Sequence, residues 1–495
     1  MLRPSLEQFR RLAECGNLVP VVAEIVNDVE TPIGAFQKIG REGFSFLFES
    51  AERNEESGRF SFIGIDPLLI VSQRSGELTI RERNGNASKH STSDPLADLQ
   101  KILAEFRFVP RDEIPHFQGG VIGFVGYDVI RFFEPKAAIH AHDDLKLPEM
   151  MFMIASALIV FDHRFRTMRV IAFADIRKGK ADSGYRAACK QIEIILEKLA
   201  APFRLQPITA DPGSGGFRPS IQTNTSDFEQ MVLRAKEYII AGDIFQVVLS
   251  QRFETEFSGG PLDLYRCLRF GNPSPYMFFL NFGGEFHVLG SSPEVHVRVR
   301  GRVAELRPIA GTRPRGDDTI SDERNARELL ADPKERAEHV MLIDLARNDL
   351  GRIAEIGSVR VTEQMTIERY SHVMHIVSHV EARLRDGLGA FDAFRATFPA
   401  GTVSGAPKIR AMQIIAELEK ARRGFYAGAV GWFGFDGNCD SCIALRSVVL
   451  KNGKAYVQAG AGIVADSDPV REREETRRKA MAVLTAIERA KELTS

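Results

Sequence analysis

The chain has 495 residues, of which 44% are hydrophobic, with 65 basic and 66 acidic side chains and a formal net charge of −1. This even balance gives no general attraction to nucleic acid or to a membrane surface, so any binding of anions has to be local. No apolar run is long enough to cross a membrane, and the N-terminus lacks the apolar core of a secretory signal. Five cysteines are few for this length, which favours a reducing compartment and predicts a soluble, cytoplasmic protein.

The first half of the chain is rich in strand signals. The runs FSFLFES (44–50), LLIVS (68–72) and MFMIASALIVF (151–161) predict strands, and a helix is expected to end near Leu199. Residues 201–226 are rich in proline and glycine and show little periodicity, so they predict a linker. We therefore expect an N-terminal region over 1–200, a linker over 201–226 and a C-terminal region over 227–495.

The second half alternates strands and longer helices, and it echoes the first. Strands are predicted within 244–257 and 286–300 from their β-branched and aromatic content. GGVIGFVGYD (119–128) and AGAVGWFGFD (427–436) share glycines at every third position, which is typical of strands that another backbone approaches closely. The pattern predicts an α+β fold with an internal duplication, rather than a doubly wound parallel sheet.

Two predicted helices carry paired carboxylates. One begins after the cap Asp332, with proline next, and places Glu335 and Glu338 on one face; it is expected to end near Gly351. The other follows a predicted flexible turn, AGAGIVADSDP, and aligns Glu472, Glu475 and Lys479. Such pairs often only complement the helix dipole, but together they have the ligand chemistry of Mg²⁺.

Other segments suggest an anionic ligand. The glycine-containing stretches 459–462 and 401–408, the latter with Thr402, can expose backbone amides, and Arg446 follows an apolar run at a predicted strand end. The segment RPIAGTRPRG (307–316) is either a basic surface loop or part of the same site. Cys439 and Cys442 are interpreted as strand cysteines rather than metal ligands, because no second pair stands at zinc spacing.

Eight motifs in order connect these features to a known family. They are GDIFQVVLSQRF, NPSPYMFFL, SSPEVHVRV, RPIAGTRPRG, AEHVMLIDLARNDLGR, YSHVMHIVS, FPAGTVSGAPK and QAGAGIVADSDP. The sequence resembles the chorismate-utilising enzymes and, within them, anthranilate synthase component I. The resemblance implies stacked antiparallel sheets flanked by helices, Mg²⁺ as cofactor, and conversion of chorismate and ammonia to anthranilate and pyruvate in tryptophan biosynthesis.

The resemblance also assigns roles at matching positions. It implies that Glu338 and Glu475 bind Mg²⁺, supported by Glu335 and Glu472. It implies that Glu294 is the general acid for the departing hydroxyl and that His375 serves the elimination of pyruvate, with Thr402 also in the catalytic set. The implied chorismate-binding residues are Gly311, Thr312, Tyr426, Arg446, Gly460, Ala461, Gly462 and Lys479.

Two positions bear on the choice among family members. Relatives that add water to chorismate have a lysine base where this chain has Gln246, and glutamine cannot act as that base. Aminodeoxychorismate synthases have lysine where this chain has Ala310, whose small side chain leaves the ring open to ammonia. The alternatives that remain are an aminodeoxychorismate-forming enzyme and a catalytically silent subunit that only binds chorismate or tryptophan.

The resemblance further implies regulation and a partner. Glu49, Ser50, Asn272, Pro275, Tyr276 and Met277 match the family's tryptophan feedback site, where a carboxylate and a hydroxyl are expected to take the amino group. No G-x-C-x-G nucleophile motif of a glutaminase is present. Ammonia is therefore expected from free ammonium or from a separate glutamine amidotransferase subunit, which makes a hetero-oligomer the expected assembly.

Overall fold

The computed structural model describes residues 2–51, 58–111, 117–137, 142–208, 225–370 and 373–493. Its strands form one hydrogen-bonded network of antiparallel ladders that divides into two arms at β4 and β8. β8 pairs with β4 along nearly its whole length, while its other edge pairs with β7 at Met150–Met153 and with β9 at Ala157–Asp162. All 13 residues of β8 are buried, which explains its unbroken apolar sequence.

The two arms have the following strand orders. The first arm runs β1 (Leu2–Arg3), β2 (Leu18–Val26), β9 (Thr167–Asp175), β8 (Met150–Asp162), β4 (Phe60–Arg74), β3 (Phe44–Glu49), β11 (Tyr276–Phe282), β12 (His287–Ser292), β21 (Ser447–Lys451), β22 (Lys454–Ile463), β10 (Gln246–Glu256) and β18 (Gly405–Ala406). The second runs β6 (Ala87–Ser91), β5 (Glu77–Glu82), β4, β8, β7 (Gly120–Val125), β19 (Ala429–Gly434), β20 (Cys439–Ile443), β13 (Val295–Arg300), β14 (Val303–Leu306) and β17 (Val373–Arg383), which also pairs with β15 (Ile309–Pro314) and β16 (Arg360–Arg369).

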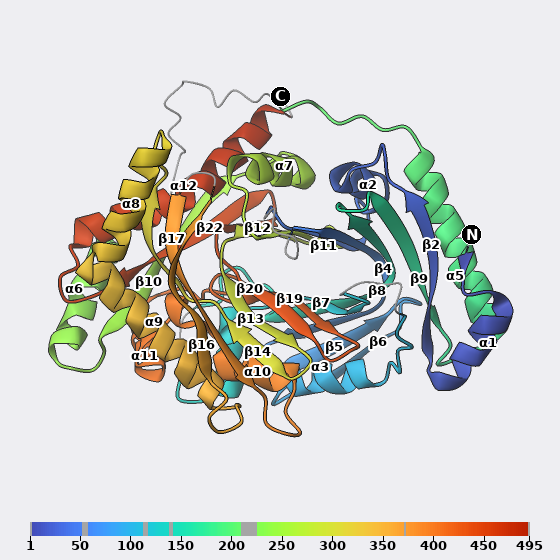
Figure 1. Cartoon of the computed structure of the whole chain (residues 1–495), viewed down its shortest axis with the longest axis horizontal. Coiled ribbons are helices and arrows are strands. Elements are labelled where there is room, and N and C mark those ends of the chain that lie inside the picture. The colour runs from blue at the N-terminus through green and yellow to red at the C-terminus, as the bar shows by residue number, and fades with distance from the viewer. Residues whose placement is uncertain are drawn as a thin grey trace.

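Helices cover both arms (Figure 1). The first arm packs against α1 (Leu6–Cys15), α2 (Pro32–Ile39), α5 (Ala181–Ala200), α7 (Pro261–Gly271) and α12 (Pro469–Glu492). A second apolar core includes residues of α3 (Pro95–Ala104), α9 (Pro333–Gly351), α10 (Ala390–Thr397) and α11 (Lys408–Leu418). The remaining helices are α4 (Ile130–Phe133), α6 (Thr225–Ile240), α8 (Thr319–Ala331) and the short 3₁₀ turns η1 (Tyr127–Val129) and η2 (Gly401–Val403). The expected stacked sheets with flanking helices are confirmed.

The two predicted regions share this sheet network. β3 pairs with β11, and β7 pairs with β19, so ladders join segments from both sides of the predicted linker. Residues 201–208 are irregular, 209–224 lie outside the described residues, and α6 already begins at Thr225.

The glycine-rich echo forms neighbouring strands. In the β7–β19 ladder Gly123 stands opposite Gly431. A Cβ at Gly123 would lie 1.9 Å from the Met151 carbonyl oxygen, and one at Gly431 would lie 2.2 Å from that of Asp440. The predicted close backbone approach is therefore confirmed, while the duplication itself stays a prediction.

Two local predictions need correction. AGAG (459–462) is not a flexible turn but the end of β22, paired with β10. Antiparallel pairing directs alternate amides to the neighbouring strand, so these residues cannot all present N–H groups to a ligand. RPIAGTRPRG is not an irregular loop either, since Ile309–Pro314 forms β15 with a register shift between Ala310 and Arg313.

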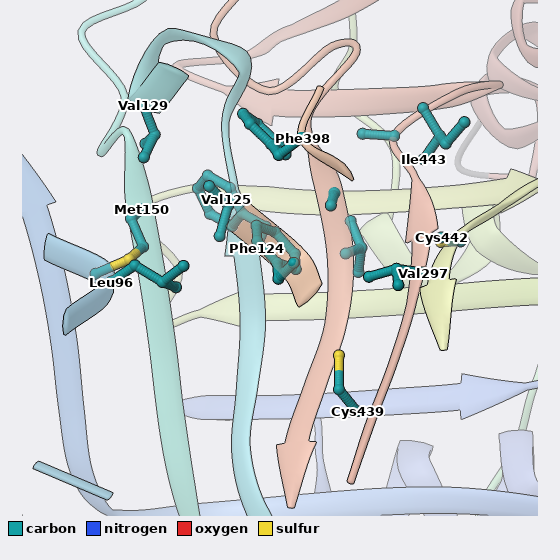
Figure 2. Close-up of a cluster of buried hydrophobic side chains, with 14 of the residues drawn as sticks. Leu96, Phe124, Val125, Val129, Met150, Val297, Phe398, Cys439, Cys442 and Ile443 are labelled. Atoms are coloured by element: carbon teal, nitrogen blue, oxygen red, sulfur yellow. The ribbon is translucent and has the colours of Figure 1, made fainter. Parts of the chain in front are cut away.

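The interpretation of Cys439 and Cys442 as strand cysteines agrees with the structure. Both are buried in β20 and belong to an apolar core, and Figure 2 shows them apart from each other. Burial raises the pKa of both thiols, which makes them poor nucleophiles. None of the described helices combines the length and apolar character of a membrane span.

Candidate active site

The carboxylate pairs stand on α9 and α12, as their caps specify. Asp332 accepts hydrogen bonds from the backbone of Lys334 and Glu335, and Asp468 accepts one from Arg471. Each cap is followed by proline at the first helical position, which suits a helix start. The sequence therefore fixes where each helix begins and which carboxylates share a face.

The two pairs converge in the structure. Burial raises the pKa of Glu338, and the neighbouring carboxylates of Glu335 and Glu475 raise it further, while Lys479 and Gln246 lower it. Burial and the charge of Glu475 also raise the pKa of Glu472. Residues predicted from two helices, 137 positions apart between Glu338 and Glu475, thus form one cluster.

This cluster suits a hard cation. Its four carboxylates face few cations: the Nζ of Lys479 lies 2.7 Å from Glu475 Oε1, and Arg313 NH1 lies 3.3 Å from Glu335 Oε1. Among the described residues no three acidic, histidine or cysteine side chains are close enough to form a complete ligand set. Mg²⁺ does not need one, because it binds through one or two carboxylates plus water and an anionic substrate.

Glu294, between β12 and β13, is connected to this cluster through Lys479, which pairs with Glu475 and whose charge also acts on Glu294. Its side chain is buried, and burial raises its pKa to about 7, opposed by Thr402, Lys479 and Arg446. The Thr402 hydroxyl is close enough to lower this pKa, yet its buried Oγ1 forms no hydrogen bond of normal geometry within the described chain. A carboxyl that is partly protonated at neutral pH is suited to act as a general acid.

Arg446 precedes β21 in an unusual backbone conformation. Its φ is +46°, which is uncommon for a residue with a Cβ and is typical of positions held by function or packing. Burial lowers its pKa, and Glu294 and Tyr370 are the anionic groups near enough to raise it. Its guanidinium forms no hydrogen bond or ion pair with any described residue, so its donors remain available for a carboxylate ligand.

His375 on β17 faces the bulged part of β15. Its Nδ1 donates to the Gly311 carbonyl oxygen at 2.8 Å and lies 3.1 Å from Thr312 Oγ1. A proton on Nδ1 leaves Nε2 unprotonated, and burial lowers the pKa of the ring, so Nε2 can act as a base. Gly311 has φ +67°, and a Cβ there would lie 3.1 Å from Glu335 Oε2.

The ends of β10 and β22 form another wall. A Cβ at Gly462 would lie 2.5 Å from Gln246 Nε2, and one at Gly460 would lie 2.7 Å from the Tyr426 hydroxyl. Lys479 donates to the Gly460 carbonyl oxygen at 3.1 Å. Ala461 is paired with Leu249 and fully buried, so its backbone alone can serve a ligand. Ala310 is half-buried and pairs with Ile376, one residue from His375.

A separate cavity of about 520 Å³ lies between the two arms. Its walls come from β3, β4 and β11 on one side and from β13, β19 and β20 on the other. Five of the six residues predicted for tryptophan binding line it: Glu49, Ser50, Pro275, Tyr276 and Met277. Asn272 does not; its side chain donates to Ser291 Oγ at 3.2 Å.

Polar groups in this cavity already have partners. Glu49 accepts hydrogen bonds from Tyr265 at 2.9 Å and from Arg269 Nε at 3.0 Å. The Tyr276 hydroxyl donates to Asp440 at 2.8 Å and accepts from Arg298 at 2.9 Å. The carboxylate of Glu49 is therefore held in place, and an amino group would have to bind to its remaining lone pairs.

Comparison with known proteins identifies the family. A family model described as chorismate binding enzyme matches residues 45–485. The chain belongs to this family. It is 45% identical to anthranilate synthase component 1 of Acetivibrio thermocellus over 500 residues, covering all of both chains.

Solved structures agree. Component I of anthranilate synthase from Streptococcus pneumoniae superposes with a TM-score of 0.77 at 39% identity, covering 93% of this chain and 99% of that one. The menaquinone-specific isochorismate synthase from Escherichia coli superposes with a TM-score of 0.70 at 19% identity, covering 98% and 99%, and shows the fold alone. The recognition made from the eight motifs is confirmed, and the chain is an enzyme of this family.

Sequence reasoning missed some residues that the structure brings to the site. The Tyr370 ring lies 5.6 Å from the His375 ring, and its hydroxyl donates to Glu368 at 2.8 Å. His339, directly after Glu338, is fully buried. His339 and Tyr370 belong to two of the eight family motifs, AEHVMLIDLARNDLGR and YSHVMHIVS. The motifs could therefore have pointed to them, but helix and strand patterns alone did not distinguish them from packing residues.

Proposed function

We propose that this chain is the aminating component of an anthranilate synthase, which converts chorismate and ammonia to anthranilate, pyruvate and water. The observation that carries this is the buried, partly protonated Glu294 carboxyl, on which the charges of the unpaired Arg446 guanidinium and of Lys479 both act, while the same Lys479 acts on Glu338 of the α9–α12 carboxylates. An acid, an anion-binding group and a cation site linked in this way suit a substrate with two carboxylates and a departing hydroxyl.

In this proposal the side chains divide the work. Arg446, with Thr312, Tyr426, Lys479 and backbone of Gly311 and Gly460–Gly462, holds the substrate. Ammonia adds to the ring and loses a proton as Glu294 donates its own proton to the hydroxyl, which departs as water, with Thr402 beside it. His375 Nε2 then removes the ring proton at the carbon that bears nitrogen. The electron pair of that C–H bond completes the aromatic ring while the bond from the ring to the enolpyruvyl oxygen breaks, and the released enolate takes up a proton to become pyruvate.

Glu338 and Glu475 are proposed to hold Mg²⁺, with Glu335 and Glu472 as supporting carboxylates. When bound, Mg²⁺ would neutralise the ring carboxylate of the substrate. Gln246, next to Gly462, cannot serve as a base for water. Ala310 leaves room beside the ring for ammonia, where a lysine would compete with it.

We further propose that a glutamine amidotransferase subunit supplies the ammonia and that tryptophan binds the cavity between the arms as feedback inhibitor. The relatives' designation as component 1 supports a partner. A cytoplasmic location stays a prediction. An aminodeoxychorismate-forming enzyme is the second candidate. Such an enzyme does not eliminate pyruvate and so does not need a base, whereas His375 is placed as a base, which favours anthranilate synthase.

The test is product identification. The purified chain is incubated with chorismate, Mg²⁺ and ammonium, and the products are separated by chromatography with fluorescence and mass detection. We expect anthranilate and equimolar pyruvate. An accumulating amino product that still carries the enolpyruvyl group would replace the proposal with the second candidate, and binding of chorismate without any product would favour a silent subunit.

A further inference from the structure

A fully buried hydrogen bond joins the helix of Glu338 to the strand of His375. His339 on α9 and Ser378 on β17 are both 0% exposed, and His339 Nε2 lies 2.7 Å from Ser378 Oγ. His339 directly follows Glu338, and Ser378 is three residues after His375. No step of the proposed reaction uses either side chain.

Ser378 also connects two further segments. Its Oγ accepts a hydrogen bond from the backbone N–H of Met365 on β16 at 2.9 Å, and its own N–H donates to the Pro308 carbonyl oxygen at 3.1 Å. Met365 has φ +53° and stands where the β16–β17 register shifts. Pro308 immediately precedes β15, which carries Ala310 and Gly311. One serine thus links α9, β16, β17 and the start of β15.

The Ser378 hydroxyl has two hydrogen-bonding partners in the described chain. One of its lone pairs accepts from the Met365 N–H. It shares its second hydrogen bond with His339 Nε2, and the direction of that bond depends on the tautomer of the ring. His339 Nδ1 has no other partner in the described chain, which makes this the one hydrogen bond that fixes the ring.

We propose that the Ser378–His339 pair is a positioning pair that sets the distance between the metal-binding carboxylate of Glu338 and the base His375. This inference rests on the proposed function for the roles of those two residues. Interactions behind a metal ligand typically change metal affinity or activity about 10- to 100-fold when removed, and displacement of reacting groups by about 1 Å has similar effects.

The experiment compares matched serine-to-alanine variants. Ser378→Ala removes the hydroxyl from the pair at the site. Ser61→Ala removes it from a second serine–histidine pair in the N-terminal half, in which the Oγ of the buried Ser61 lies 2.8 Å from Nε2 of the exposed His163. Binding of Mn²⁺ as a probe of the metal site is measured by calorimetry, and kcat and KM for chorismate are measured with Mg²⁺ and ammonium.

We expect Ser378→Ala to bind Mn²⁺ about 10-fold more weakly and to lose roughly 10- to 100-fold in kcat, with KM little changed. Ser61→Ala, which removes a serine–histidine hydrogen bond elsewhere in the chain, should keep both properties. A Ser378→Ala protein with wild-type Mn²⁺ affinity and kcat would overturn the proposal, and so would equal losses in Ser61→Ala.

A second pair of variants covers the case that Ser378→Ala does not fold. The side-chain amide of His339→Gln can still reach Ser378, whereas His339→Leu cannot hydrogen-bond, so only the former should retain Mn²⁺ binding. Mn²⁺ binding can be measured without turnover. A wild-type chain that binds Mn²⁺ but makes no anthranilate contradicts the proposed function, while the role of the Ser378–His339 pair is still decided by its variants. A wild-type chain that binds no Mn²⁺ overturns the proposed role of this pair.

Discussion

At the scale of single residues, Glu294 shows how burial prepares a side chain for chemistry. Its carboxyl lies among apolar and polar groups that exclude water, and its pKa rises to about 7 although Lys479 and Arg446 stand nearby. A carboxyl with a raised pKa keeps its proton below that value and loses it above. The acid form that the proposed mechanism requires is therefore present at and below neutral pH in the free chain.

We predict that Glu294→Gln lowers kcat by about 10²- to 10⁴-fold, because an amide of the same shape cannot donate the proton. We expect kcat/KM of the wild type to fall above about pH 7, and this fall should be absent from any residual activity of the variant. Pre-steady-state and steady-state assays between pH 5 and pH 9, about two units on either side of that pKa, provide the measurement. A variant with wild-type rate would remove Glu294 from the mechanism.

The raised pKa of Glu294 also makes the stability of the folded chain decrease with rising pH. The folded chain binds the Glu294 proton more tightly than the unfolded chain, so the free energy of unfolding falls as pH rises from about 4.5 to about 7. Glu294→Gln should not show this part of the pH dependence, which amounts to at most about 3 kcal/mol. Urea denaturation of both proteins at the two ends of this range is the control for the kinetic result.

At the scale of elements, α9 and α12 bring the carboxylates together because each helix start is fixed locally. We predict that Glu338→Gln abolishes turnover while the chain stays folded, since a neutral amide is a poor ligand for a hard dication. Activity is titrated with Mg²⁺, and circular dichroism reports the fold. Glu474→Gln on α12, a half-exposed residue paired with Arg473, is the matched control and should retain activity. Wild-type turnover in excess chelator would contradict the metal assignment.

These helices were predictable, and parts of the sheet were not. Caps, proline and carboxylate spacing are local signals, so α9 (Pro333–Gly351) ends where the sequence predicts, and α12 (Pro469–Glu492) begins at the end of the segment AGAGIVADSDP, as expected. AGAG was misassigned because its glycines resemble a turn when read locally, while its structure is decided by pairing with β10, about 200 residues away. Which strands are neighbours depends on such non-local contacts, and patterns along the chain do not contain them.

The candidate site was assembled from the sequence mainly through the motif order, and its residue roles stay predictions. Spacing placed Glu335 with Glu338 and Glu472 with Glu475, but only the family resemblance connected the two helices with Glu294 and His375. Residues without a motif role, such as His339 and Tyr370, were missed because buried histidines and tyrosines most often serve packing. The register shift in β15, which turns Gly311 toward Glu335, was likewise invisible in the sequence.

At the scale of the whole molecule, the cavity between the arms and the candidate active site share a wall. Pro293 and Val295 line the cavity, and Glu294 between them lines a small space with Thr402. Arg307 and Ile309 also line the cavity just before Ala310 and Gly311. A ligand that shifts β13 or the start of β15 therefore changes the position of Glu294, the proposed general acid, and of the Gly311 carbonyl that orients His375.

This arrangement supports the last prediction, which concerns feedback inhibition. We expect tryptophan to inhibit the wild type and Ser50→Phe to relieve that inhibition, because a phenyl ring at Ser50 occupies space in the cavity without reaching the active site. Uninhibited kcat should stay within about twofold, whereas the inhibition constant should rise by roughly 5- to 150-fold, the usual range of coupling between two sites. Ser91→Phe on the exposed strand β6 is the control for added apolar surface and should remain inhibited.

If tryptophan at millimolar concentration leaves the wild-type rate unchanged, the cavity does not serve as its site. If Ser50→Phe stays fully inhibited, tryptophan acts elsewhere, and the shared wall of Pro293–Val295 is not the route between them.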